Sequence, residues 1–187
     1  MADSNITKKA LAAALTELMN EMPFSKINVS DICNKCDMNR KSFYYHFKDK
    51  YDLVNWIFDI GFISAFTVTP QREWYVWDFC ERLFNYLYEN RVFYRKALCI
   101  TGQNAFSEHF RETLYTVLVN NVRDIINIKE LPAFQIDFFV DAFVCSVERW
   151  INDKNCMPPD EYMRNLKYCF VLCRKVDDNI NNENSEP

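Results

Sequence analysis

Glycine is nearly absent from this chain, and its scarcity limits the folds that the chain can adopt. Only two of the 187 residues are glycine, and six are proline. All-β proteins and nucleotide-binding α/β proteins need many more glycines, for their turns and phosphate loops. Few helix breakers, combined with long segments that repeat apolar residues at helical spacing, predict an all-α protein.

The apolar periodicity and the capping residues divide the chain into helices joined by short breaks. Pro23 ends the first helix, and Asp49 caps the fourth. The expected helices cover about residues 5–22, 29–36, 40–47, 50–66, 74–89, 92–98, 106–126, 132–153 and 160–176. We expect a small helical head over residues 1–55, a larger helical bundle over 56–176, and a polar, disordered tail over 177–187.

The charge is distributed unevenly between these parts. Residues 1–50 carry 8 Lys and Arg against 6 Asp and Glu, a net charge of +2, whereas residues 51–187 carry 14 and 20, a net charge of −6. A mildly basic head on an acidic body suits a protein whose head alone meets DNA phosphates. No signal-peptide pattern and no membrane-spanning apolar run is visible, so we expect a cytoplasmic protein with no membrane partner.

Residues 24–53 hold the pattern that points most directly to function. They predict two short helices joined by a tight turn at Asp37 and Met38, followed by the start of another helix. Asn39 is placed to cap the second short helix, and the hydroxyl of Ser30, at the start of the first, can meet a phosphate. The second short helix carries side chains that donate hydrogen bonds and stack, as a DNA major groove requires: Arg40, Lys41, Ser42, Tyr44, Tyr45 and His46.

The string from Val29 to Leu53, above all Phe-Tyr-Tyr-His-Phe-Lys-Asp-Lys at 43–50, resembles the DNA-binding head of the tetracycline-repressor (TetR) family of bacterial regulators. The similarity covers about residues 5–55 and implies a three-helix head on a larger helical body, working as a homodimer on a palindromic DNA operator. It implies base and phosphate contacts at these positions: Ser30, Asn39, Arg40, Lys41, Ser42, Tyr44, Tyr45, His46 and Lys50.

Two positions depart from the family pattern. Asp37 stands where the family usually has a glycine in the turn, and Lys41 stands where a small residue is common. Aspartate tolerates a left-handed backbone better than most residues, so the turn can form. Lys41 bears on which DNA sequence is read rather than on whether DNA is bound.

Two cysteines, Cys33 and Cys36, have the spacing of a redox pair or of half a zinc site. A redox pair needs a thioredoxin-like strand context, and a zinc site needs two further ligands; neither is present nearby. We therefore interpret both as small core residues, and expect no metal, no cofactor and no catalytic residue. A thiol-based redox or metal sensor built on Cys33 and Cys36 is the rival hypothesis.

The body is rich in aromatic residues, most of which must form its core. Some of them are expected to line a pocket for a small hydrophobic ligand, because bulky rings between helices leave apolar cavities.

Residues 91–112 resemble, more weakly, the body of the dihydroxyacetone-kinase regulator subgroup, some of whose members work with a protein co-regulator. Repression is the expected action, and activation through a protein co-regulator is the alternative. An adaptor whose body docks another protein is a third hypothesis.

The last two expected helices carry the predicted dimer interface. The helix over 132–153 is apolar on nearly every side, which indicates burial on every side. If the body covers one face of this helix, a partner subunit would cover the other. The predicted interface residues are Phe138, Ala142, Trp150, Met163, Leu166, Phe170 and Cys173.

Overall fold

The computed structural model describes residues 2–67, 76–101, 105–126, 133–169 and 171, and within these ranges the chain is all-helical, as predicted. The elements are α1 (Ala2–Glu21), the 3-10 turn η1 (Phe24–Lys26), α2 (Val29–Lys35), α3 (Arg40–His46), α4 (Lys50–Thr67), α5 (Val76–Glu89), α6 (Arg91–Leu98), α7 (Phe106–Ile126) and α8 (Ala133–Asn152). Residues 159–169 form a further helix after α8. Where the predicted helix ends fall among the described residues, they agree with these to within a few residues; the end predicted at 176 lies outside them.

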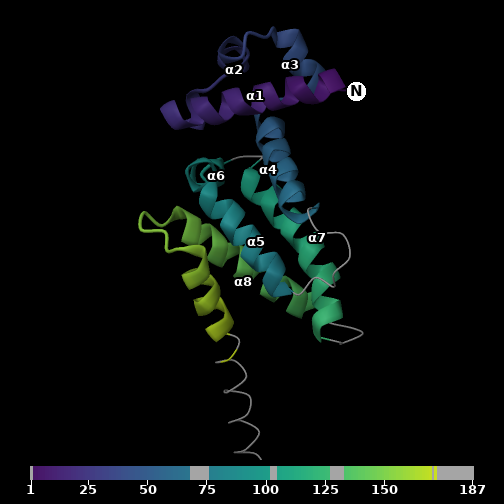
Figure 1. Ribbon diagram of the computed structural model, residues 1–187, viewed down its shortest axis with the longest axis vertical. Helices are drawn as coiled ribbons and strands as arrows, with labels where there is room; N and C mark the ends of the chain where they lie inside the picture. The colour runs from purple at the N-terminus through teal and green to yellow at the C-terminus, as the bar shows by residue number, and fades with distance from the viewer. Residues whose placement is uncertain (1, 68–75, 102–104, 127–132, 170, 172–187) are drawn as a thin grey trace, which may run out of the picture.

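Helices α1, α2 and α3 lie together at one end of the molecule, with the start of α4 beneath them (Figure 1). Their shared core is closed, because Leu15 of α1, Ile32 of α2, Phe43 of α3 and Leu53 of α4 are each 0% exposed. These four side chains come from four helices and belong to the hydrophobic core. The buried side chains of the head are continuous with those of the body, so one hydrophobic core runs through both.

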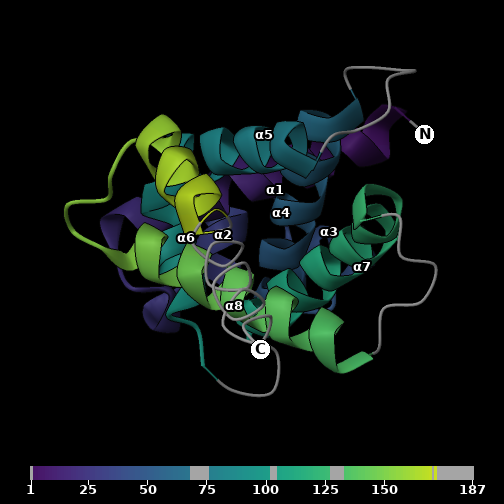
Figure 2. The same ribbon diagram turned by 90° about the horizontal axis from the view of Figure 1, so that it is seen from below.

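Helix α4 leaves the head and runs into the body, where α5 lies on one side of it and α7 on the other (Figure 2). Phe58 of α4 is fully buried, and its ring meets the rings of Tyr94, Phe106 and Phe110 at centroid distances of 6.0, 5.5 and 5.3 Å. Edge-to-face packing of this kind is favourable for aromatic rings. The body therefore packs around the part of α4 that begins near Phe58.

Helix α5 comes so close to α4 that only glycine fits at one position of the contact. A Cβ added to Gly61 would overlap the hydroxyl and ring of Tyr86. Tyr86 cannot easily move away, because its hydroxyl is hydrogen-bonded to that of Tyr94, which is 1% exposed. Gly61 thus permits the close approach of two helices.

The predicted dimer residues separate into two groups. Phe138 and Ala142 are exposed on α8 and Leu166 is half-buried, so these three have surface to offer a partner. Trp150 and Met163 are buried within the protomer instead, at 4% and 8% exposure. Helical periodicity marks apolar faces but does not tell which neighbour covers each one.

Trp150 is held inside by the segment that follows α8. Its ring stacks on Tyr162 at 4.4 Å between centroids, and its Nε1 donates to the carbonyl of Met157 at 2.8 Å. Phe170, Cys173 and the tail predicted over 177–187 lie outside the described residues.

Candidate nucleic-acid interface

Each helix of the pair α2 and α3 begins at an asparagine cap. Asn28 forms a reciprocal capping box with Asp31, its Oδ1 accepting from the Asp31 amide at 3.0 Å. Asn39 Oδ1 accepts from the amide of Ser42 at 2.8 Å, as the sequence predicted. Such caps satisfy amides that the first helical turn leaves unpaired, and so fix where α2 and α3 start.

The turn between α2 and α3 passes through a left-handed residue. Asp37 has φ 52°, and Met38 then donates its amide to the carbonyl of Cys33 at 2.8 Å. Met38 is partly buried and packs against the core. The chain thus forms its turn with aspartate where glycine is usual, since aspartate is among the residues that adopt this conformation most readily.

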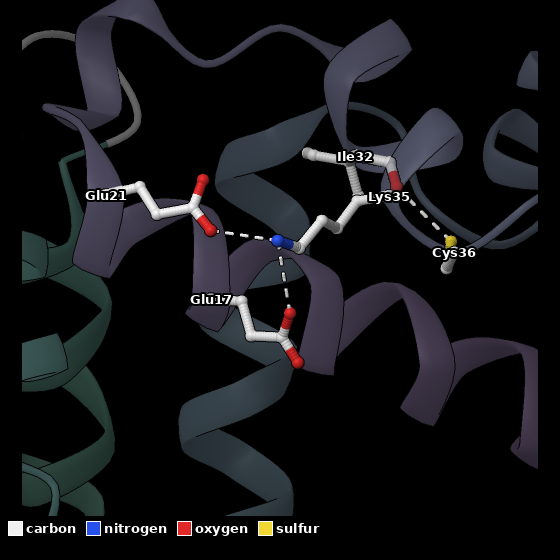
Figure 3. Close-up of polar contacts among 5 residues, drawn as sticks. All are labelled: Glu17, Glu21, Ile32, Lys35 and Cys36. Atoms are coloured by element: carbon white, nitrogen blue, oxygen red, sulfur yellow. Dashed lines mark hydrogen bonds and ion pairs between the residues drawn. The ribbon is translucent and has the colours of Figure 1, made fainter.

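Helix α2 is also joined to α1 by charge. Lys35 lies between Glu17 and Glu21 of α1, with Nζ–carboxylate distances of 3.4 and 2.8 Å (Figure 3). The hydrogen bond to Glu21 raises the pKa of Lys35. Because these groups are solvent-exposed, the contacts orient α2 more than they stabilise the fold.

Helix α3 presents one face to the core and the other to solvent. Phe43 is 0% exposed, whereas Tyr44 is 51% and Tyr45 is 82% exposed. Arg40 and Lys41 are exposed as well, while Ser42 and His46 are half-buried at its edges. A tyrosine as exposed as Tyr45 contributes little to the core and remains available to a partner.

Two pairs of side chains organise the exposed face of α3. Arg40 Nη2 lies 3.4 Å from the hydroxyl of Tyr44, and its guanidinium carbon lies 5.8 Å from the Tyr44 ring centroid. The hydrogen bond to Tyr44 raises the pKa of Arg40. The rings of Tyr45 and His46 meet edge to face at 4.9 Å. The face therefore carries a fixed positive charge beside stacked, hydrogen-bonding rings, which suits base edges and phosphates.

Lys50, the first residue of α4, has a role that the sequence did not predict. Its Nζ donates to the carbonyls of Phe24 and Ile27, at 2.8 and 2.6 Å, and lies 4.3 Å from the Phe24 ring centroid. Burial lowers the pKa of this ammonium. Lys50 thus joins α4 to the turn before α2, leaving one of its three protons for a phosphate.

Cys33 and Cys36 have the environment of packed thiols. Cys33 is 1% exposed and Cys36 is half-buried, and burial raises the pKa of both. The Cys36 Sγ lies 3.2 Å from the carbonyl oxygen of Ile32 (Figure 3). Since a reactive or metal-binding cysteine needs a low pKa and access, the geometry favours the packing interpretation over the thiol sensor.

A polar cavity of about 340 Å³ lies where the head meets the body, between the start of α4 and α7. Asp52, Asn55 and His109 are among its lining residues, and the Oδ1 of Asn55 is buried with no hydrogen-bond partner. The pocket expected from the sequence was apolar and within the body, so this cavity is of a different kind.

Among the residues that the structure describes, no helix combines the length and the apolar character needed to cross a bilayer. In the same part of the chain, no three His, Cys, Asp or Glu side chains gather as a metal ion would require.

Comparison with known families gives two matches that together cover most of the chain. Residues 11–57 match the family described as bacterial regulatory proteins, tetR family, and residues 76–170 match the one described as transcriptional regulator C-terminal region. Both descriptions are of regulators.

Individual proteins show the same similarity. The HTH-type dhaKLM operon transcriptional activator DhaS of Lactococcus lactis subsp. lactis (strain IL1403) is 35% identical over 111 residues, which are 59% of this chain and 57% of the relative. The chain thus aligns with little more than half of that relative's length.

Two solved structures have a similar fold. A structure of the dihydroxyacetone kinase operon activator DhaS has a TM-score of 0.64 at 22% identity, covering 91% of this chain and 97% of that one. A TetR transcriptional regulator from Streptococcus agalactiae 2603V has a TM-score of 0.67 at 20% identity, covering 91% and 95%.

Proposed function

This chain belongs to the TetR family of bacterial regulatory proteins and is a DNA-binding transcriptional regulator, and we propose that the exposed face of α3 is the surface that reads its operator. The observation that carries this proposal is the capped helix α3, anchored by buried Phe43, with Arg40, Lys41 and Tyr45 exposed on the other face. A helix of this size fits the major groove of duplex DNA.

We assign base contacts to Arg40 and Lys41. Arginine and lysine recognise guanine O6 and N7 in the major groove. Arg40 is already oriented by its contact with Tyr44, so less side-chain entropy is lost when it binds a base.

The remaining predicted residues of the interface surround these two. Tyr44 and Tyr45 are exposed side chains whose hydroxyls can bind phosphates, and Ser30 lies in the first turn of α2. Asn39 acts through its cap, Ser42 and His46 flank the face, and Lys50 has one proton left for a phosphate. Such contacts fix the register of a protein on DNA, whereas base contacts select the sequence.

The homodimer is proposed to form through α8 and the helix after it. Phe134, Phe138 and Phe139 of α8 are 76%, 60% and 48% exposed, and Tyr168 of the following helix is 57% exposed. Phe138 and Phe139 also contact each other, with ring centroids 5.7 Å apart, and exposed apolar surface of this kind is typical of protein interfaces. Two-fold symmetry would then present two α3 helices to a palindromic operator, with half-sites separated by one or more DNA turns of roughly 34–36 Å.

The division between head and body is proposed to fall within α4, near residue 55. The family matches support this placement, since the first ends at residue 57 and the second begins at 76. A signal bound by the body would change the separation of the heads and thereby the affinity for DNA, in the cytoplasm where the operator lies.

Two questions about regulation have two candidate answers each: whether the protein represses or activates transcription, and which effector the body binds. Repression follows from operator occupancy alone and is our first candidate. Activation is the second, because the relative at 35% identity is named an activator. The signal is either a small hydrophobic ligand or a protein co-regulator. An in vitro transcription assay with and without the purified protein tests the sign directly, because a repressor lowers transcript yield and an activator raises it.

The test of the proposed interface replaces two lysines in turn and measures the affinity for duplex DNA by fluorescence anisotropy. The duplex is one that the wild-type protein selects from a random pool. Lys41 is exposed on α3, and Lys154 is exposed in the turn after α8. Lys41→Ala should weaken binding, whereas Lys154→Ala should bind as the wild type does. Equal affinity for all three proteins would contradict the assignment of α3.

A further inference from the structure

Two adjacent cations in the last turn of α6, Arg95 and Lys96, contact the ends of two other helices. Arg95 donates from Nε to the carbonyl of Ile151 at 2.9 Å and from Nη2 to the carbonyl of Asp153 at 2.8 Å. Ile151 lies in the last turn of α8, and Asp153 follows its final residue. Arg95 therefore binds the C-terminal end of α8.

Lys96 makes the equivalent contact with the head. Its Nζ donates to the carbonyl of Met19 and lies 3.3 Å from the carbonyl oxygen of Asn20. Both carbonyls belong to the last turn of α1. Lys96 is thus a side chain of the body that binds a backbone of the head, separately from the covalent path through α4.

Both contacts have the same physical basis. The last four carbonyls of a helix have no partner within it and carry the negative end of the helix dipole. Lysine and arginine side chains can donate hydrogen bonds to these carbonyls and interact favourably with the dipole. Figure 1 shows α6 between the C-terminal end of α1 and α8, and α6 contacts both helices. One turn of α6 therefore holds two helix ends at a fixed separation.

We propose that Arg95 and Lys96 are positioning residues for DNA reading, which fix the head relative to α8 and so set the distance between the two α3 helices of the dimer. The inference rests on the proposed function, since it needs α8 to form the dimer interface. Through this link, a change at α8 reaches α1 without passing along α4.

The test measures which half-site separation the dimer prefers. Palindromic duplexes that differ by single base pairs in half-site spacing, and a duplex with one half-site, are titrated with wild type, Lys96→Met, Arg95→Met and the double variant. Methionine keeps an apolar stem and removes the charge and the donors. Lys154→Met is the matched control, and Lys96→Arg is the conservative variant that should restore the contact.

At the spacing that the wild type prefers, we expect the Met variants to bind roughly five- to tenfold more weakly, as is usual for coupled sites. Their affinity should depend less on spacing, and their affinity for the single half-site should be unchanged. An unaltered spacing profile overturns the proposal. An equal loss on the single half-site does so too, because it would mean that the head itself is damaged.

Amide hydrogen exchange, measured without DNA, tests the link between Lys96 and α1 independently of the proposed DNA-binding function. Lys96→Met should speed exchange in the last turn of α1, and Lys154→Met should not; unchanged exchange overturns the link. If the wild type binds no palindrome, the proposed function fails, and exchange still decides whether Lys96 holds α1. Should Lys96→Met not fold, Lys96→Gln, which keeps a hydrogen-bond donor but loses the charge, replaces it in both measurements.

Discussion

His109 of α7 and Asp59 of α4 are joined by a hydrogen bond of 2.7 Å between Nε2 and Oδ1. Asp59 lies in the part of α4 that has entered the body, beside Phe58, whose ring also meets His109 at 6.2 Å. The hydrogen bond to Asp59 is the main reason that the pKa of His109 is raised, and the charges of Glu112 and Asp52 act in the same direction.

The contact predicts a pH dependence of stability. Because the folded pKa of His109 is raised, its stabilisation is complete below the unfolded pKa of about 6.5 and is lost as the pH rises through the folded pKa. Replacing His109 by Gln should therefore lower the free energy of unfolding more at pH 6 than at pH 9. Both side chains are partly exposed, so the difference should be at most about 1 kcal/mol. Urea unfolding of both proteins at the two pH values measures it. If the difference in unfolding free energy between the wild type and His109→Gln grew as the pH rose, the ion pair between His109 and Asp59 would not be its cause.

Because α4 and α5 approach closely at Gly61, we predict that any side chain at this position lowers the stability of the fold. Gly61→Ala should destabilise the protein by about 1–3 kcal/mol, as overpacking does at a tight contact, because its methyl group would overlap Tyr86. Urea unfolding measures the loss. In Gly61→Ala/Tyr86→Leu, the alanine should cost less than in the wild-type background; an equal cost in both would mean that Tyr86 is not what excludes the methyl group.

Arg40 is predicted to select a base. Arg40→Ala should relax the preference at one position of each half-site by about 1–3 kcal/mol and leave the other positions unchanged. Binding to a set of operators with single base substitutions measures this. If the variant kept the wild-type preference at every position, Arg40 would not be reading a base.

Lys50 is predicted to serve both the fold and the phosphate backbone. Lys50→Ala removes two hydrogen bonds to carbonyls, which should lower stability by about 1–3 kcal/mol. It should also weaken binding to all DNA sequences alike and reduce the slope of log affinity against log salt by about one. Thermal unfolding and salt titrations separate the two effects. Reduced stability with an unchanged slope would leave Lys50 only the structural role.

The exposed aromatic residues of α8 predict where the dimer can be broken. Phe138 is 60% exposed in the protomer, so Phe138→Asp should leave the fold intact and place a charge in the interface, where its desolvation is costly. Analytical ultracentrifugation should then find a monomer with the helical content of the wild type. A variant that remained dimeric would move the interface away from this part of α8.

Local chemistry made much of the head predictable from sequence. The caps at Asn39 and Asp49 follow from side chains that bind nearby amides, and both are present. The left-handed turn at Asp37 follows in the same way. Such features depend on a few neighbouring residues, so a single sequence contains them.

Contacts between distant segments were not predictable in this way. Nothing in the sequence places Lys50 on the carbonyls of Phe24 and Ile27, since the lysine lies more than 20 residues away from both. The burial of Trp150 under Tyr162 likewise depends on how the chain returns after α8. Periodicity identifies an apolar face, and only tertiary packing decides whether that face meets its own chain or a partner.

Selection of bound duplexes from a random DNA pool tests the central claim most directly, that α3 reads an operator as part of a two-fold dimer. The wild-type protein should enrich an inverted repeat whose half-sites lie one or more DNA turns apart. The double variant Arg40→Ala/Lys41→Ala should not enrich this repeat. No enrichment by the wild type, or the same inverted repeat enriched by the variant, would contradict the account.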